Sequence, residues 1–507
     1  MNTNTNAGHR DVKAFLIFLV AAILLFHVGT ALKGHGRFRD IHLGTALHYS
    51  QTKIDLAHTI IVGFNATNTP TIQELPLWQA VVGLAFKCLG GWWGWANVVS
   101  LVLFLPCLYP LFHLARMHLG ERESYWVLCF FLAQPLVFLE AGEASPDGTS
   151  LATSLWFLFF SLQLLRQPGL KWLAPACLLG CLAAVFKLPF FMTAGLAALV
   201  ILLRTHGFCR QRLACLGLVG GVSAVAFLLW THYTDAAQAG AEFPHVDLRL
   251  GHGSTMMFWY FGDLQYRLSP GIWLKGGLRI TTALLGSFCL LGLVVLGWRS
   301  RPGNPAAKSF LLGAALTTLV FFHLVLHHWH YYLMFAPAVA LFCAMGWSAV
   351  EAKFTPIPDR SGWPTALAAV LLLLALGQGL IGMRALTFDN YPLHVSALIR
   401  QHTAPTDKLV IIGGAWGGEE LMRSDRQGLT AWDAKMFDHP ESLDRLKALG
   451  FDKVVLLNQS PFQNAIQIVN PGQSDIPRLR YADALTPRVE SWPTVFQTED
   501  VLIKAIP

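Results

Sequence analysis

Long apolar runs alternate with short charged connections along the first three-quarters of this chain. The first run, residues 14–32, holds 19 residues without a charge, and roughly 20 apolar residues cross a bilayer core. The pattern therefore predicts a polytopic α-helical membrane protein with about 11 spans. They lie near residues 14–32, 96–115, 124–139, 150–165, 172–186, 190–203, 213–231, 276–298, 309–326, 331–350 and 364–383.

The first run has one alternative. Arg10 and Lys13 could form the basic region of a cleaved signal peptide. The apolar part is long, however, and no clear small-x-small cleavage site follows it. We therefore expect a retained span.

Short basic connections assign the faces of the membrane, because cytoplasmic loops carry an excess of lysine and arginine. With the amino terminus inside, eleven spans place all the short basic loops in the cytoplasm. This parity requires that "LPLWQAVVGLAFKCLGG" (75–91), which follows Glu74 and contains Lys87, does not cross. We expect it to form a helix in the outer interface, and we expect the segments 33–95 and 232–275 to be external.

After about residue 386 the pattern becomes that of a soluble domain. "DKLVIIGG" and "DKVVLLN" predict strands, and "HPESLDRLKALG" predicts an amphipathic helix that ends at Gly450. We therefore divide the chain into a membrane domain, 1–385, and a small extracytoplasmic α/β domain, 386–507. "GGAWGGEE" (413–420) lacks the spacing of a nucleotide-binding loop, and a plain glycine turn is the favoured interpretation.

Composition and charge support a membrane protein and exclude two other classes. Apolar residues make up 54% of the chain and charged residues only 13%, against about 25% charged in soluble proteins. The basic excess lies in membrane loops, so we do not expect nucleic-acid binding. All nine cysteines lie between Cys88 and Cys343, in or near apolar runs, which supports neither a disulfide framework nor a Cys-rich metal site.

Several stretches, taken in order, resemble lipid-linked-sugar glycosyltransferases of the GT-C fold, in particular the protein O-mannosyltransferase and aminoarabinose-transferase branch. The stretches are "FRDIHLGTALHYSQ" (38–51), "QELPLWQAVVGLAFKCLGG" (73–91), "EASPDGTSLATSLWFLFFSLQLL" (143–165), "FKLPF" (186–190) and "HWHYYLMFAPAVAL" (328–341). The resemblance implies a multi-pass enzyme of the cytoplasmic (inner) membrane. Its site and C-terminal domain would lie on the extracytoplasmic side.

The resemblance also implies roles for single residues. Asp40 matches the catalytic acid, which would accept a proton from the acceptor hydroxyl; a solvated helix end is the alternative. Glu74 matches an acid that positions substrate or metal, although the adjacent family lysine is Leu75 here. Asp147 is a second candidate for the substrate site, or simply a helix N-cap.

Positive and hydrogen-bonding groups are needed near the leaving phosphate. Lys187 either pairs with the lipid phosphate or snorkels to the interface, and the family glycine after it is Leu188. In "HLVLHHWHYY", we select His328, His330 and Tyr331 as substrate-binding candidates, with an interfacial aromatic belt as the alternative.

No cofactor is predicted with certainty. The histidine spacing around residues 327–330 does not resemble a structural metal site, and some relatives' acid–His pair is Asp263 followed by Leu264 here. A divalent ion implied by the family stays open.

The resemblance implies hexosyl or pentosyl transfer, with inversion, from a polyprenyl-phosphate sugar donor. The acceptor, a lipid, a protein or an envelope glycan, is not identified. The alternative is a transporter or flippase of lipid-linked saccharides. Such proteins bind near mid-membrane, often between inverted repeats, whereas here the polar candidates gather on one face.

Overall fold

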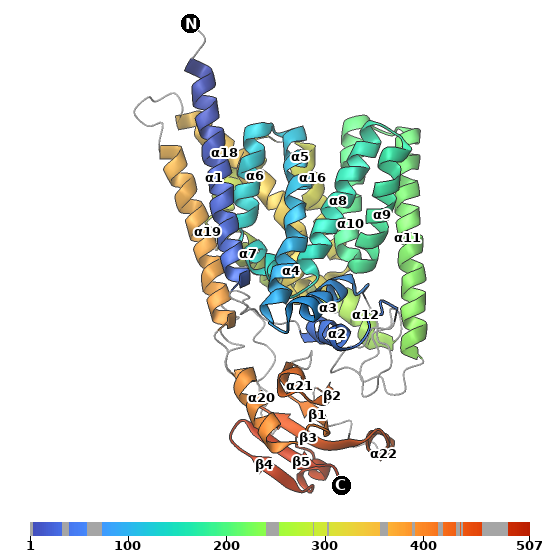
Figure 1. The fold of residues 1–507 in the computed structure, drawn as a ribbon. Helices are drawn as coiled ribbons and strands as arrows, with labels where there is room; N and C mark the ends of the chain where they lie inside the picture. Colours follow the sequence, from blue (N-terminus) through green and yellow to red (C-terminus); the bar gives the residue numbers. More distant parts are fainter. Residues whose placement is uncertain are drawn as a thin grey trace.

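In the computed structural model, a bundle of long apolar helices stands above a small mixed β-sheet (Figure 1). The structure describes residues 4–32, 40–57, 74–239, 253–286, 288–301, 304–354, 363–387, 391–413, 419–431, 437, 440–458 and 485–507. The protein is a multi-pass membrane protein, as the alternation of apolar and charged segments predicted.

Every predicted apolar run contains helix. The bundle helices are α1 (Asn4–Leu32), α4 (Gly94–Phe104), α5 (Leu108–His118), α6 (Glu121–Ala133), α7 (Pro135–Ala141), α8 (Asp147–Arg166), α9 (Leu170–Phe186), α10 (Leu188–His206), α11 (Arg210–Ala239), α14 (Pro270–Leu284), α15 (Leu291–Ser300), α16 (Pro305–Val320), α17 (Phe322–His327), α18 (Ala336–Phe354) and α19 (Trp363–Thr387). Two 3₁₀ segments, η1 (Leu105–Cys107) and η2 (Trp329–Phe335), join α4 to α5 and lead into α18.

In the described part of the chain, fewer helices are long enough to span a membrane than the sequence pattern predicts. Within the described residues, six helices are long and apolar enough to cross a membrane, and the bent α6–α7 pair would make seven. Four further predicted spans coincide with shorter apolar helices at 170–186, 291–300, 305–320 and 366–381. The count of eleven therefore stays a prediction.

Three predicted spans are broken rather than continuous. The run 124–139 bends by 73° between α6 and α7, because Pro135 lacks the N–H that a continuous helix needs. The carbonyl of Leu132 lies 3.0 Å from Nε2 of His27 on α1, a contact that satisfies it at the break. The run 276–298 is interrupted between α14 and α15, where Gly286 has a φ of +55°. The run 309–326 stops and restarts at Phe321.

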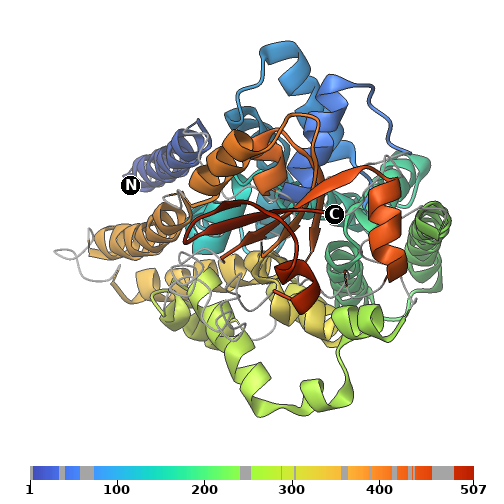
Figure 2. The ribbon, with the colours of Figure 1, turned by 90° about the horizontal axis from the view of Figure 1, so that it is seen from below.

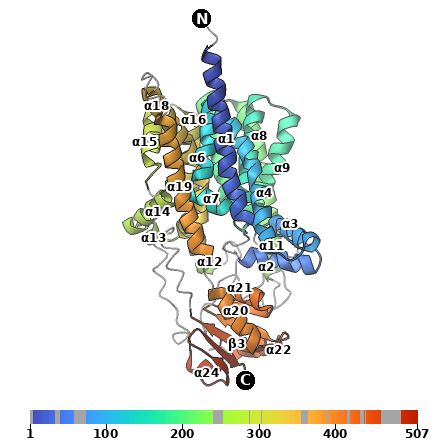
Figure 3. The same ribbon diagram turned by 60° about the vertical axis from the view of Figure 1, so that its left-hand side comes forward.

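Two short helices lie at the lower end of the bundle, away from the amino terminus (Figures 1 and 3). They are α2 (Asp40–Gln51) and α3 (Leu77–Leu89), and they pack against each other. With 13 residues, α3 is about 20 Å long, too short to cross a 30 Å hydrocarbon core. This placement agrees with the expectation that residues 75–91 do not cross.

On the opposite side of the molecule the lower end carries α12 (Gly253–Phe261) and α13 (Leu264–Leu268), followed by α14 (Figure 3). Trp259 on α12 packs against the rings of both His323 and His327 on α17, with centroids 5.4 and 5.0 Å away. The described part of the second long loop is therefore fixed to the bundle next to the histidine-rich segment.

The tail forms a five-stranded sheet in the order β2-β1-β3-β5-β4. Its strands are β1 (Lys408–Ile412), β2 (Gln427–Ala431), β3 (Phe451–Leu457), β4 (Thr494–Gln497) and β5 (Val501–Ala505), with helices α20 (Tyr391–His402), α21 (Glu419–Ser424), α22 (Pro440–Ala448) and α24 (Pro487–Glu490). β1 is parallel to β2 and β3, whereas β5 is antiparallel to β3 and β4. The two strands and the helix expected from the sequence are present.

Alternating residues of β1 supply two separate buried cores, as the two-residue period of a strand requires. Val410 and Ile412 pack into one core, and Leu409 and Ile411 pack into the other. The loop after β1 begins at Gly413, whose φ is +85° and where an added Cβ would lie 2.3 Å from the carbonyl oxygen of Leu457. Glycine is needed there for packing, and residues 414–418 of "GGAWGGEE" lie outside the described residues.

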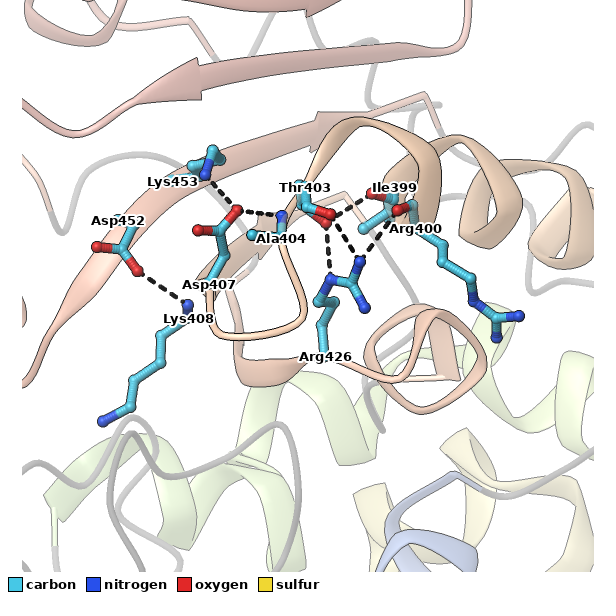
Figure 4. Close-up of polar contacts among 9 residues, drawn as sticks. All are labelled: Ile399, Arg400, Thr403, Ala404, Asp407, Lys408, Arg426, Asp452 and Lys453. Carbon is cyan, nitrogen blue, oxygen red and sulfur yellow. Dashed lines mark hydrogen bonds and ion pairs between the residues drawn. The ribbon is translucent and has the colours of Figure 1, made fainter.

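Buried polar groups fasten α20 to the sheet (Figure 4). The guanidinium of Arg426 donates to the hydroxyl of Thr403 at 2.8 Å and to the carbonyl oxygens of Arg400 and Thr403 at 3.0 and 2.7 Å. Asp407 accepts from the amide of Ala404 at 2.7 Å and pairs with Lys453. These contacts hold the turn between α20 and β1, and they involve no group of the membrane part.

Seen from below, the sheet lies across the lower face of the bundle (Figure 2). The guanidinium of Arg423 on α21 lies 5.5 Å from the ring centroid of Trp93, in the turn between α3 and α4. The tail and the α2–α3 pair therefore share one end of the molecule, as the sequence predicted. That this end is extracytoplasmic stays a prediction.

Candidate functional site

The site is centred on a buried lysine between two carboxylates. Nζ of Lys187 lies 2.6 Å from Oδ1 of Asp147 and 3.2 Å from Oε1 of Glu74. The Asp147 side chain is fully buried and that of Lys187 is 5% exposed, whereas that of Glu74 is 26% exposed. Three candidates that the sequence places far apart thus form one ion-paired cluster.

The ends of three helices bring these residues together. Lys187 is the single extended residue between α9 and α10, with φ −155° and ψ 101°, and Pro189 lies in the first turn of the second helix. The amide of Leu75 donates to the carbonyl of Val185 at 3.1 Å, which holds the segment before α3 against the end of α9. Glu74 consequently lies beside Lys187.

Asp147 is the first residue of α8, immediately after Pro146. The hydroxyl of Ser145 donates to its Oδ2 at 3.3 Å. No side-chain capping hydrogen bond is made by the N-cap residue of α8, and the other carboxylate oxygen of Asp147 faces Lys187. Asp147 therefore combines a place in the first turn, where a helix favours negative charge, with an ion pair.

Residues of the segment η2 lie beside the ion-paired cluster. Nε2 of His330 lies 4.0 Å from Oδ1 of Asp147, and Nζ of Lys187 lies 5.1 Å from the ring centroid of Tyr331. The His328 ring stands 5.2 Å from that of His330. His330 and Tyr331 therefore face the ion-paired cluster, with His328 beside them.

Asp40 is the first residue of α2, and its side chain lies outside the part of the chain that the structure describes. The helix it begins is well fixed. Gln79 Nε2 on α3 lies 2.8 Å from Nδ1 of His42. Leu43 belongs to the same buried cluster as Ala144, three residues before Asp147. The start of α2 is thus tied to the segment that leads into the site.

Two acids and one arginine near the site were not selected from the sequence. Glu140 and Glu143 are both buried, in α7 and in the segment that leads to Asp147. Arg279 on α14 is buried too, and it donates to carbonyls at the end of α17. Only the position of Glu143 next to the "SPD" motif could have drawn attention to it.

The described residues do not fit a divalent metal. No group of three or more His, Cys, Asp or Glu among them is arranged to hold an ion. Glu74 and Asp147 both face the Lys187 ammonium, which repels a cation. Nη1 of Arg279 lies 3.4 Å from the carbonyl oxygen of His327, so a positive charge also lies beside the histidine-rich segment. We therefore derive no step that passes through a metal.

Comparison with known proteins rests on structure. No family model matches the sequence, and no curated protein gives a significant match. ArnT from Cupriavidus metallidurans bound to undecaprenyl phosphate superimposes with a TM-score of 0.63 at 14% identity, over 97% of this chain and 98% of that one. The apo state of the same ArnT gives a TM-score of 0.62 at 14% identity, over 98% of both chains.

Two further solved structures share the architecture. The Archaeoglobus fulgidus oligosaccharyltransferase has a TM-score of 0.56 at 11% identity, over 87% of this chain and 69% of that one. The mycobacterial arabinofuranosyltransferase AftD has a TM-score of 0.52 at 13% identity, over 97% of this chain and 41% of that one. At such identities the likeness establishes the fold. The chain is a membrane protein of the GT-C fold, with a small C-terminal β-sheet and its flanking helices.

Proposed function

We propose that the protein is a membrane glycosyltransferase, which moves one sugar from a polyprenyl-phosphate donor to an acceptor on the extracytoplasmic face. The observation that carries the proposal is the cluster of Lys187, Asp147 and Glu74, next to His330 and Tyr331, at the end of a GT-C bundle. The similar ArnT structure was solved with undecaprenyl phosphate, which supports a carrier of that class.

The proposed reaction is a direct displacement at the anomeric carbon of the sugar. The acceptor hydroxyl oxygen attacks the anomeric carbon, its proton passes to the Asp40 carboxylate, and the bond from that carbon to the phosphate oxygen breaks. The electron pair leaves on the polyprenyl phosphate. A single displacement of this kind inverts the anomeric configuration.

The leaving phosphate needs hydrogen-bond donors. His328, His330 and Tyr331 on one side of the cluster can supply these hydrogen-bond donors. Lys187 can supply charge only by sharing it with two carboxylates, so we assign it mainly to holding Glu74 and Asp147 in place. These acids then bind sugar or acceptor hydroxyls.

The rival activity is transport of the intact lipid-linked saccharide. Transporters bind near the bilayer midplane, often where helices are broken. The ion-paired cluster instead comes from the start of α8, the α9–α10 turn and the segment before α3, beside the short helices at one end of the bundle. This position supports chemistry at the interface over passage through the membrane.

Reconstitution tests the proposal. The purified protein in liposomes is given a panel of labelled hexosyl and pentosyl polyprenyl phosphates, together with lipid, protein and envelope-glycan fractions as acceptors. We expect label to leave the carrier and to appear in one acceptor fraction. Label that crosses the bilayer while still attached to the carrier would establish transport instead.

A further inference from the structure

A buried arginine outside the ion-paired cluster is attached to the segment that carries His330. Arg279 lies on α14 with only 7% of its surface exposed. Its Nη1 donates to the carbonyl oxygens of Leu326 and, at 3.4 Å, of His327. The hydroxyl of Tyr332 donates to the same Leu326 oxygen at 3.5 Å. Arg279 thus binds the last turn of α17.

The last carbonyls of a helix have no partner within the helix, so another group must satisfy them. At this end α17 gives way to η2 through the extended residue His328, whose φ is −102° and ψ is 111°. The direction in which η2 leaves α17 therefore depends on what binds these carbonyls. A positively charged donor is the favoured partner at a helix carboxyl end.

Close packing fixes the distance between the two helices. An added Cβ at Gly276 on α14 would lie 2.8 Å from Cδ2 of Leu326. Arg279 follows Gly276 by three residues and so lies on the same face of α14. A guanidinium, with its fixed fork of donors, can reach two neighbouring carbonyls from there.

We propose that Arg279 is a positioning residue, which sets the α17–η2 turn so that His330 and Tyr331 face Asp147 and Lys187. The inference rests on the proposed function, because it assigns η2 to the donor phosphate. Loss of the guanidinium releases two buried carbonyls, lets the turn shift and moves both rings away from the phosphate.

The test compares Arg279→Gln with Arg279→Lys and with Arg267→Gln. Arg267 is the matched control, because it donates to the carbonyls of Leu319 and Val320 at 2.9 and 3.1 Å, at the end of α16. We measure kcat, the KM of donor and of acceptor, and the Kd of undecaprenyl phosphate alone, with each variant in detergent or liposomes.

We expect Arg279→Gln to raise the donor KM and the undecaprenyl phosphate Kd by about tenfold, the equivalent of one lost hydrogen bond. Misplaced contacts should also lower kcat, by on the order of 10²-fold. The acceptor KM should not change. Arg279→Lys, which keeps the charge but not the fixed fork of donors, should recover part of both losses. Arg267→Gln should bind the donor as the parent does.

Each other outcome is decisive. A smaller active fraction with unchanged donor KM and Kd would mean that Arg279 contributes to stability alone. Equally weakened donor binding in Arg267→Gln would mean that Arg279 has no specific role in positioning η2. If Arg279→Gln does not accumulate, a parental donor KM in Arg279→Lys refutes the inference. If the parent protein transfers no sugar, the proposed function fails, while the undecaprenyl phosphate Kd still tests Arg279.

Discussion

Replacement of Lys187 by methionine would remove the one charge that lies between Asp147 and Glu74, with little change in side-chain volume. The Asp147 carboxylate is fully buried, and its Oδ1 is 2.6 Å from the ammonium. The variant therefore leaves a buried carboxylate without this counter-charge. Breaking a buried ion pair in this way typically costs about 3–5 kcal/mol.

The two ion pairs of Lys187 should contribute unequally to the free energy of unfolding. At an effective dielectric constant near 20, two unit charges attract by about 6 kcal/mol at 2.6 Å and by about 5 kcal/mol at 3.2 Å, before desolvation is subtracted. Glu74 is 26% exposed, so water screens its ion pair more strongly. We expect Glu74→Gln to lower the free energy of unfolding by about 1 kcal/mol, and Lys187→Met by about 3 kcal/mol or more.

A double-mutant cycle separates the ion pair from mere packing. Lys187→Met, Asp147→Asn and the double variant are compared by denaturant or thermal unfolding in one detergent. Because the double variant has no unpaired charge at this pair, it should be more stable than Lys187→Met alone. A coupling energy of more than about 1 kcal/mol is expected for residues in contact.

A Lys187→Met variant as stable as the parent, or two single effects that simply add, would refute a stabilising ion pair between Lys187 and Asp147. Additivity would mean that the charges do not interact across the 2.6 Å contact. Lys187→Arg is the control that separates charge from geometry. A guanidinium keeps the positive charge, but its planar shape differs from that of the ammonium that approaches two carboxylates.

Three further predictions concern catalysis, topology and the tail. Asp40→Asn should reduce sugar transfer by about 10²–10⁴-fold in steady-state assays while donor binding survives, because a general base is removed. Asp55, whose Oδ1 accepts from the Ala57 amide, is the control, and Asp55→Asn should reduce transfer only slightly. A larger loss of transfer in Asp55→Asn would refute the assignment of Asp40. Exposed Cys88 on α3 should react with an impermeant maleimide added to intact cells and lose that label in Cys88→Ser; protection would place this end inside. Deleting residues 390–507 should lower stability or acceptor recognition but leave some sugar transfer, and a folded truncation with none would make the tail essential.

Much of the fold follows from local pattern. Long apolar runs located the bundle helices, although three of the runs are each broken into two helices. The strands in "DKLVIIGG" and "DKVVLLN" could be predicted because each is a short apolar run beside turn residues. The breaks could have been anticipated in part. Pro135 and Gly286 lie inside two of the predicted spans, and both residues weaken a helix.

The site could be predicted only as a set of candidates on one face. Nothing local in the sequence shows that Lys187 lies between Asp147 and Glu74, since this depends on how α8, α9 and the segment before α3 pack. The same holds for the contact of Gln79 with His42. Arg279 could not be predicted as a site residue, because a single arginine in an apolar run gives no sign of the helix end it binds.

The charges of the described cluster argue for a division of labour within the site. One lysine between two carboxylates leaves a net negative charge, which by itself repels a phosphate. An anionic donor phosphate is therefore better placed on the η2 side, where His330 and Tyr331 offer hydrogen-bond donors. The acids then face the sugar and the acceptor, whose hydroxyls they can bind. This arrangement also explains why Lys187 sits at a helix break, since a single extended residue between two apolar helices can turn its ammonium inward to both acids.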